Sequence, residues 1–281
     1  MLWNLVAVIF LMIVNWSLEA VKWKLAVKQV QEISFLKSLR AVLSGVSFSV
    51  STPNRVGEYL GRVLYMNEGN RLKTISLTIV GSISQLIITL LMGFAGLVLL
   101  QKDIVAAHLI SPMWMNVILY GVLAVLMGLT LFYFRLSWLV KWVDRFPGTN
   151  RFSYLVKALE GFNATLLLQL LSLSLVRFTV FIIQYYLLFR LFNVEVSVWL
   201  VFWTVSVSFL VMAVIPGIAI IELVQRGKVI TSIVGMYSVN DLGMTFATAS
   251  VWFINLILPA IAGSLLIFSL KKLYSNESKR V

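Results

Sequence analysis

The chain has 281 residues, of which 60% are hydrophobic and 12% are charged. Soluble domains carry roughly 25% charged residues, so this composition excludes an ordinary soluble protein and predicts an all-α, polytopic integral membrane protein. Basic residues outnumber acidic ones by 23 to 11. Because they flank apolar runs, they fit the positive-inside rule better than nucleic-acid binding, and we expect no nucleic acid as a partner.

The first predicted spanning helix covers about residues 2–21, which at 1.5 Å per residue suffices to cross a bilayer core of roughly 30 Å. No basic segment or cleavage site of a signal peptide accompanies this apolar run. Five basic residues follow it against a single acid, Glu32, so we predict a cytoplasmic connection and an amino terminus outside. These basic residues are Lys22, Lys24, Lys28, Lys37 and Arg40.

A charged helix break follows at residues 51–62, with the sequence STPNRVGEYLGR. Pro53 has no N–H and disfavours an α conformation in the residue before it, so the incoming helix should end here and a second should begin near Arg55. On that second helix Arg55, Glu58 and Arg62 share one face. Both flanks of the break are basic, and we therefore predict a re-entrant hairpin that enters from the cytoplasm and returns there.

Two long apolar runs follow, and we predict an outward span over 75–100 and an inward span over 114–134. The first contains Gly81, Gly93 and Gly96, small residues that let neighbouring helices approach closely. Basic residues then mark about 135–160 as a cytoplasmic connection, in which two tryptophans favour an interfacial helix.

The next predicted span, 164–189, contains Arg177 near its middle. An arginine at this depth costs roughly 2.5–3.5 kcal/mol on insertion scales, so it should face the bundle interior and bind a partner. Two interpretations stay open: a phosphate contact on a transport path, or a structural ion pair. The candidate acids for the ion pair are Glu58, Glu222 and Glu160.

A second break is predicted at Pro216 and Gly217, between apolar helices at 196–215 and 218–237. Glu222 and Arg226 follow it with the same spacing of four residues that separates the glutamate and arginine of the first break. A last span over 246–270 runs inward, because basic residues place the carboxyl terminus inside.

The two breaks predict an inverted repeat within a single transmembrane domain, 1–281, with half-repeats at about 34–134 and 164–272. From the distribution of charges we predict that the first hairpin enters the membrane from the cytoplasm and the second from the outside. In transporters with this arrangement, the substrate site forms between the broken helices near the bilayer midplane. Arg226 and Lys228 leave another interpretation open, in which they mark a cytoplasmic excursion after a full span.

At Pro53-Asn54-Arg55-Val56-Gly57-Glu58 the sequence resembles the flippase-like transmembrane domain family of the lysylphosphatidylglycerol synthases. The family's motif at this position resembles Pro-Gly-Arg-x-Gly-Glu. The family also resembles this chain in a second Pro-Gly element with a downstream glutamate, which corresponds to Pro216, Gly217 and Glu222. Ala219 stands where the usual second motif has glycine. The resemblance covers nearly the whole chain.

This resemblance implies a multi-pass protein of the inner (cytoplasmic) membrane that handles a lipid, such as an aminoacylated phospholipid or an isoprenoid-linked precursor. Family members commonly carry one more helix before the region matching 2–21, so we expect a chain shortened at its start. We expect no aminoacyl-transferase domain after Leu270, and the resemblance then implies translocation of a lipid and not its synthesis.

We predict a polar cavity between the two hairpins that receives a lipid headgroup. Guanidinium groups bind phosphate as bidentate forks, and glutamates hold these forks or meet an amine of the headgroup. The alternative is a purely structural role, in which Glu–Arg pairs one turn apart only stabilise the hairpins. Candidate substrate-binding residues are Arg55, Glu58, Arg62, Arg177, Glu222 and Arg226, and the residues of the helix breaks are Pro53, Gly57, Pro216 and Gly217.

The chain has no cysteine and one histidine, His108, which we expect to be a solvated loop residue because no ligand cluster accompanies it. Walker A, HExxH and nucleophile-elbow patterns do not occur. We therefore assign no metal, no cofactor and no catalytic residue. Tryptophans are expected in interface belts and packing, and the serines of 171–175 in contacts between helices.

The leading hypothesis is a lipid translocase that is not an enzyme, with a membrane lipid as its partner and a membrane enzyme as a second candidate partner. The alternative is a non-catalytic scaffold or accessory subunit of a lipid or envelope biosynthesis enzyme, in which the polar hairpins only stabilise the fold. A third hypothesis is an intramembrane enzyme that uses Glu58 as a base, and the lack of a histidine or metal cluster disfavours it.

Overall fold

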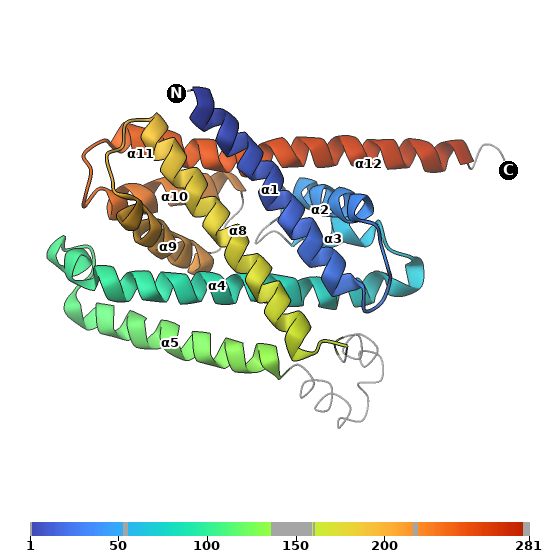
Figure 1. Ribbon diagram of the computed structural model, residues 1–281, viewed down its shortest axis with the longest axis horizontal. Helices are drawn as coiled ribbons and strands as arrows, with labels where there is room; N and C mark the ends of the chain where they lie inside the picture. Colours follow the sequence, from blue (N-terminus) through green and yellow to red (C-terminus); the bar gives the residue numbers. More distant parts are fainter. Residues whose placement is uncertain (1, 53–55, 136–158, 160, 216–218, 278–281) are drawn as a thin grey trace.

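The structure is a computed structural model that describes residues 2–52, 56–135, 159, 161–215 and 219–277 (Figure 1). None of these residues forms a β-strand, which confirms the all-α prediction. Five helical segments in this part of the chain are long and apolar enough to cross a membrane. They are Trp3–Val27, Glu68–Ala106, Pro112–Phe134, Ala164–Leu191 and Asp241–Phe268.

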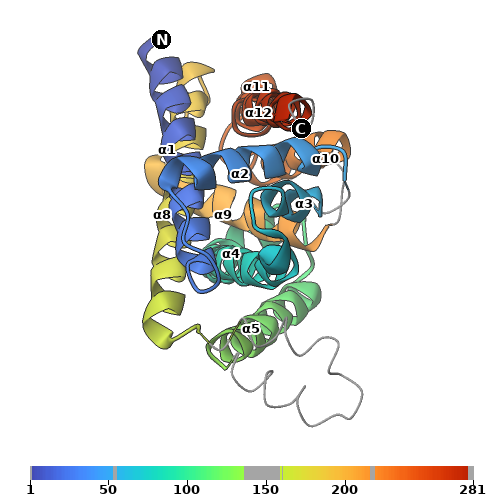
Figure 2. The same cartoon turned by 90° about the vertical axis from the view of Figure 1, so that its right-hand side faces the viewer.

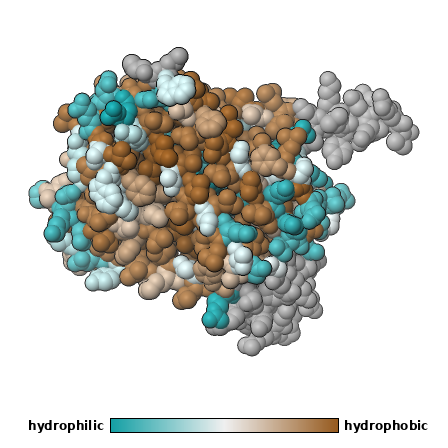
Figure 3. Space-filling view, in the orientation of Figure 1, coloured by the Kyte–Doolittle hydropathy of each residue, from teal (hydrophilic) through white to brown (hydrophobic). Residues whose placement is uncertain are grey.

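The long helices form the frame of the molecule. Helix α4 (Arg71–Ala106) runs along the long axis in Figure 1 and is seen end-on in Figure 2, as is α12 (Leu258–Glu277). Helices α1 (Leu2–Val27) and α8 (Ala164–Leu191) pack against each other and cross this axis obliquely. Helix α5 (Pro112–Phe134) covers α4 and leaves most of its own surface exposed. A broad hydrophobic surface lies between two more polar ends of the molecule (Figure 3).

Two shorter helix pairs lie within this frame, at the positions of the predicted breaks. Helix α2 (Phe35–Ser49) packs against α3 (Gly57–Val63), and α9 (Val198–Val214) packs against α10 (Ala219–Val234). The helices thus end before each break and resume after it. Four residues assigned to the breaks or to the site lie outside the described part of the chain: Pro53, Arg55, Pro216 and Gly217.

The two pairs lie toward opposite ends of α4, as Figure 1 shows. Each pair packs against a long helix of the other half of the chain, since α2 contacts α12 and α9 contacts α4. This crossed packing joins the two predicted half-repeats, and the inverted symmetry between them stays a prediction. The orientation of each pair relative to a membrane stays a prediction.

Glycines make both crossed contacts close. A Cβ added to Gly93 of α4 would lie 2.4 Å from Cβ of Leu210 on α9, and one on Gly96 would lie 2.9 Å from Cγ2 of Val207. On α12, a Cβ at Gly263 would lie 2.0 Å from the carbonyl oxygen of Leu43 on α2. The prediction that small residues bring helices together is confirmed for Gly93 and Gly96, which lie in the α4–α9 seam.

Polar caps explain where several helices begin. The side chains of Ser34, Asn163, Ser197 and Asn240 accept hydrogen bonds from backbone N–H groups in the first turns of α2, α8, α9 and α11 (Asp241–Trp252), respectively. These bonds satisfy donors that have no partner within a helix. Between α11 and α12 the chain passes through one π-helical turn, Phe253–Ile257. His108 is exposed in the turn after α4 with a φ of 54°, in agreement with its assignment as a loop residue.

The first helix pair depends on three glycines. A Cβ on Gly61 would lie 2.5 Å from Cα of Gly45, and a Cβ on Gly45 would lie 2.7 Å from the carbonyl oxygen of Glu58. Gly57 starts α3 directly beside α2, where an added Cβ would lie 2.3 Å from the carbonyl oxygen of Phe48. Backbone therefore packs on backbone across this pair, and the contact fixes where Glu58 and Arg62 point.

We expect Gly61→Ala to separate α2 from α3 and to destabilise the protein by about 1–3 kcal/mol, the usual cost of overpacking. The measurement is the midpoint of thermal unfolding of the purified protein in detergent. Gly128→Ala is the matched control, because Gly128 also lies in a helix and an added Cβ there would meet nothing within 4 Å. Equal midpoints for the two variants would contradict the close α2–α3 contact.

Candidate functional site

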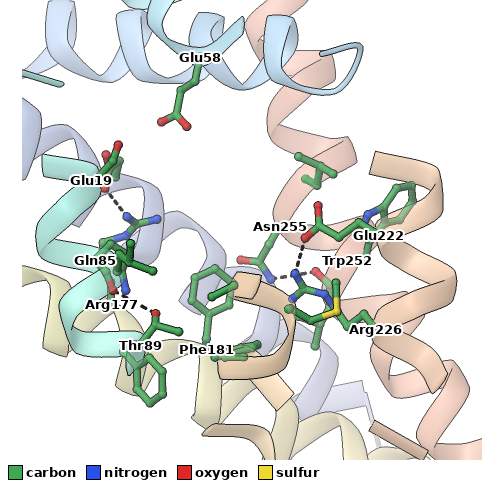
Figure 4. Close-up of a pocket in the computed structure, with 18 of the residues that line it drawn as sticks. Glu19, Glu58, Gln85, Thr89, Arg177, Phe181, Glu222, Arg226, Trp252 and Asn255 are labelled. Atoms are coloured by element: carbon green, nitrogen blue, oxygen red, sulfur yellow. Dashed lines mark hydrogen bonds and ion pairs between the residues drawn. The ribbon is translucent and has the colours of Figure 1, made fainter. Parts of the chain in front are cut away.

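A cavity of about 650 Å³ lies in the centre of the bundle, between the two helix pairs (Figure 4). Side chains from both pairs and from all four long helical segments around it contribute to its wall, namely α1, α4, α8 and α11 with the π-helical turn. Its charged lining residues are Glu19, Lys22, Glu58, Arg177, Glu222 and Arg226. The fold therefore brings together charges that are far apart in the sequence.

Glu19 of α1 is the centre of the first charge cluster. Its carboxylate accepts from Arg62 of α3 at 2.8 Å, from Lys22 one turn along α1 at 2.8 Å, and from Arg177 of α8. The side chain of Glu19 is 7% exposed, so three cations share one buried carboxylate. Arg62 also pairs with Glu58, which lies one turn before it on α3.

Arg177 is held by further contacts beside Glu19. Its Nε donates to Oδ1 of Asn15 at 2.9 Å, and its guanidinium lies 5.7 Å from the ring centroid of Trp16. Asn15 in turn donates to Asn255 at 3.4 Å. Asn255 belongs to the π-helical turn, which thereby supplies a polar group to the cavity wall.

Lys22 lies inside the cluster and not at a membrane surface. Only 2% of the residue is exposed, and Nζ also donates to Oγ of Ser174 at 3.4 Å. Ser174 is hydrogen-bonded to Ser84 of α4 at 2.9 Å, which confirms the prediction of serine contacts between helices for this residue. The prediction that Lys22 follows the first spanning helix was wrong, because α1 continues to Val27 and Lys22 is buried within the bundle. The cytoplasmic side of this segment stays a prediction.

The second charge cluster belongs to α10. Glu222 and Arg226 form an ion pair across one helical turn, with side chains that are 16% and 13% exposed. The Arg226 guanidinium lies 5.7 Å from the ring centroid of Phe209 on α9. Figure 4 shows this pair on the far side of the cavity from Glu19 and Arg177.

Positive charge exceeds negative charge around the cavity. Among the described residues, the three lining glutamates face the three lining cations, and Arg62 adds a fourth cation behind Glu19. Several buried N–H groups also have no acceptor within the described part of the chain. Three of them belong to residues that line the cavity, namely Nε1 of Trp16, Nε of Arg226 and Nε1 of Trp252, whereas one acceptor in the same wall, Oε1 of Gln85, has no donor among the described residues. A buried donor without an acceptor is costly, so the site favours a ligand that accepts hydrogen bonds and bears negative charge.

The predicted site residues are largely brought together. Glu58, Arg177, Glu222 and Arg226 line one cavity, whereas Arg62 is absent from its lining and contacts Glu19 and Glu58 from behind. The two Glu–Arg pairs expected for a purely structural role, Glu58–Arg62 and Glu222–Arg226, also form. Glu58, Glu222 and Arg226 therefore take part in ion pairs within the helix pairs and also line the cavity.

Two of the three acids predicted as candidate partners of Arg177 do not pair with it. Arg177 pairs with Glu19 and not with Glu58 or Glu222, and Glu160 lies outside the described residues. Glu19 and Lys22 were missed because both lie at the end of an apolar run, where charges are usually interfacial. Their spacing of i and i+3 on one helix face was the signal available in the sequence.

The tryptophans, which were expected in interface belts and in packing, are divided between the surface and the interior. Trp3, Trp114 and Trp199 are exposed, as interface residues would be, while Trp16 lines the cavity and Trp23 is buried beneath Arg62. The tryptophans of the predicted interfacial helix, at 138 and 142, lie outside the described residues.

Within the described ranges, no group of three or more His, Cys, Asp or Glu side chains is arranged to bind a metal.

Comparison with known proteins identifies the family. Neither the curated proteins nor the solved structures contain a match to this chain. Residues 1–263 match the family model described as the lysylphosphatidylglycerol synthase TM region. This range includes both helix pairs and every charged residue of the cavity wall. The chain is a multi-pass membrane protein that belongs to the lysylphosphatidylglycerol synthase transmembrane-region family.

Proposed function

We propose that this protein is a lipid translocase of the inner (cytoplasmic) membrane, which shelters a phosphorylated headgroup in the central cavity as the lipid crosses. The observation that supports the proposal is the excess of buried donors over acceptors around a cavity at the meeting point of two interrupted helix pairs. Intramembrane charges of this kind are by default candidates for a transport path. Suitable lipids are an aminoacylated phospholipid or an isoprenoid-linked precursor.

The chemistry of the wall suits a phosphate group. Arg177 and Arg226 approach the cavity from opposite sides, and guanidinium groups bind phosphate oxygens with two parallel hydrogen bonds. The indole N–H groups of Trp16 and Trp252 supply neutral donors that add no further charge. Glu58 and Glu222 lie in the same wall, where a carboxylate can meet an amine on the headgroup.

This function requires no covalent step, and we therefore propose a transporter and not an enzyme. The sequence has no Walker A loop to bind ATP. Net movement of lipid would then follow an ion gradient, consumption of the lipid on one side, or coupling to a membrane enzyme as a partner.

A second candidate is a non-catalytic scaffold for a lipid or envelope biosynthesis enzyme. The observation in its favour is that both hairpin glutamates, Glu58 and Glu222, already have an arginine partner one turn away. In that case the ion pairs stabilise the helix pairs and no lipid headgroup enters the cavity.

Headgroup accessibility in reconstituted vesicles distinguishes the two candidates. We expect wild-type protein to move a fluorescent, headgroup-labelled phosphatidylglycerol between leaflets, and Glu58→Gln and Glu222→Gln to slow this movement at least tenfold. Glu32→Gln is the matched control, because Glu32 is exposed and does not line the cavity. Lipid movement no faster than in protein-free vesicles would overturn the translocase, whereas equal rates for all three variants would remove both glutamates from the site.

A further inference from the structure

The cavity has an apolar side that the headgroup chemistry does not explain. Its lining includes Leu86 of α4 and the residues that end α9, among them Met212 and Val214, followed by Ile215. Leu86 and Ile215 are each 37% exposed and Val214 is 70% exposed. The polar wall around Glu19 and this apolar side belong to one continuous cavity.

The course of the α4–α9 seam explains why the cavity opens here. Gly96 contacts α9 at Trp203 and Val207, and Gly93 contacts it at Ser206 and Leu210, so the two helices run antiparallel in close contact. One to two turns further along the same seam, Leu86 of α4 and Val214 of α9 are exposed and line the cavity. The cavity thus reaches the surface of the bundle beside the α4–α9 contact, at Leu86 and Val214.

We expect this opening to lie at membrane depth. Leu86 is close to the middle of α4, which spans Arg71–Ala106, and the helix is apolar enough to cross a bilayer. An opening at the middle of a spanning helix faces hydrocarbon and not water. Apolar side chains at its edge are therefore expected to contact an apolar chain and not solvent.

We propose that this opening between α4 and α9, bordered by Ser82, Leu86, Val214 and Ile215, is a lateral portal that holds the apolar chain of a lipid while its anionic headgroup occupies the cavity. The inference rests on the proposed function and extends it to the other end of the same ligand. A cavity with cationic donors in its wall and exposed aliphatic side chains at its edge is complementary to an anionic amphiphile and not to a soluble anion.

Two probes with the same headgroup separate the portal from the headgroup cavity. Dihexanoyl phosphatidylglycerol carries two short chains, whereas glycerophosphoglycerol has the same monoanionic phosphodiester and no chain. We expect the purified full-length protein to bind the chain-bearing probe at least tenfold more tightly in detergent solution, as measured by isothermal titration calorimetry.

Substitutions at the portal should change only the contribution of the chain. We expect Leu86→Ser and Val214→Ser each to reduce the affinity ratio of the two probes at least threefold without changing the affinity for glycerophosphoglycerol. Ser82→Leu adds apolar surface at the portal, and we expect it to raise the affinity for the chain-bearing probe. Leu131→Ser on α5 is the control, because Leu131 is 67% exposed and does not line the cavity.

The possible failures are distinct. A wild-type affinity ratio near one, or equal ratios for the portal variants and Leu131→Ser, would overturn the portal and leave the headgroup cavity in place. Failure of wild-type protein to bind either probe would overturn the proposed function and the portal with it.

Discussion

Glu19→Leu is expected to destabilise the protein by about 3–5 kcal/mol, the usual effect of removing one partner from a buried ion pair. Glu19 is the shared acceptor of Lys22, Arg62 and Arg177, and its loss leaves Lys22 and Arg177 without a carboxylate in the cluster. Arg62 would keep only Glu58. Uncompensated cations in a buried site are costly, so the bundle should loosen where α1, α3 and α8 meet.

Thermal unfolding in detergent measures this effect. Glu32→Leu serves as the control, because the Glu32 side chain is 82% exposed and its pair with Lys28 at 3.8 Å is solvated. Such a surface pair contributes at most about 1 kcal/mol. A Glu19→Leu midpoint equal to that of Glu32→Leu would show that the cluster adds nothing to stability. We further expect Glu19→Leu combined with Lys22→Leu to recover part of the loss, since one uncompensated cation is then removed.

Arg177→Gln is expected to have the opposite profile, with a large loss of transport and a small loss of stability. Glu19 keeps Lys22 and Arg62 as partners when Arg177 is replaced, so the cluster stays neutralised. The cavity, however, loses the guanidinium that lies over Trp16 in its wall. Truncating one partner of a buried charge pair at a binding site costs about 2 kcal/mol or more of binding free energy. We therefore expect the rate of lipid movement to fall about 30-fold.

The measurement is lipid movement in reconstituted vesicles together with the unfolding midpoint in detergent. Arg190→Gln is a matched control, because Arg190 lies at the exposed end of the same helix. We expect Arg177→Lys to restore only part of the rate, since lysine keeps the charge but lacks the planar fork. Unchanged transport in Arg177→Gln would exclude Arg177 from the headgroup site and favour its role as a structural ion pair.

The sequence predicts the helical architecture well because long apolar runs have few alternatives in a membrane. Apolar runs and their charged flanks locate five spanning segments, and the positions of proline locate two interruptions between helices. The predicted limits differ from the observed ones mainly at charged or polar ends. Helix α1, for example, continues six residues beyond the predicted end at 21, to Val27.

The site is less predictable, for a physical reason. Charge counting assigns Lys22 to a membrane surface, because its local sequence is basic and it follows an apolar run. Its burial depends on contacts with Glu19 beside it and with Ser174 on a helix more than 150 residues away. The close packing of Gly45 on Gly61 likewise depends on how two helices fold back on each other. Such pairings are set by tertiary structure, which periodicity in one helix does not encode.

The crossed packing of the two halves has a consequence for biogenesis. Helix α2 needs α12, which leaves the ribosome more than 200 residues later, at about 5–20 residues per second. The first helix pair must therefore wait in the membrane, with its charges already present, for roughly ten seconds or longer. Arg62 can pair during this interval, since Glu19 and Glu58 are both made before it. The early carboxylates thus neutralise Arg62 within the first helix pair before α12 is made.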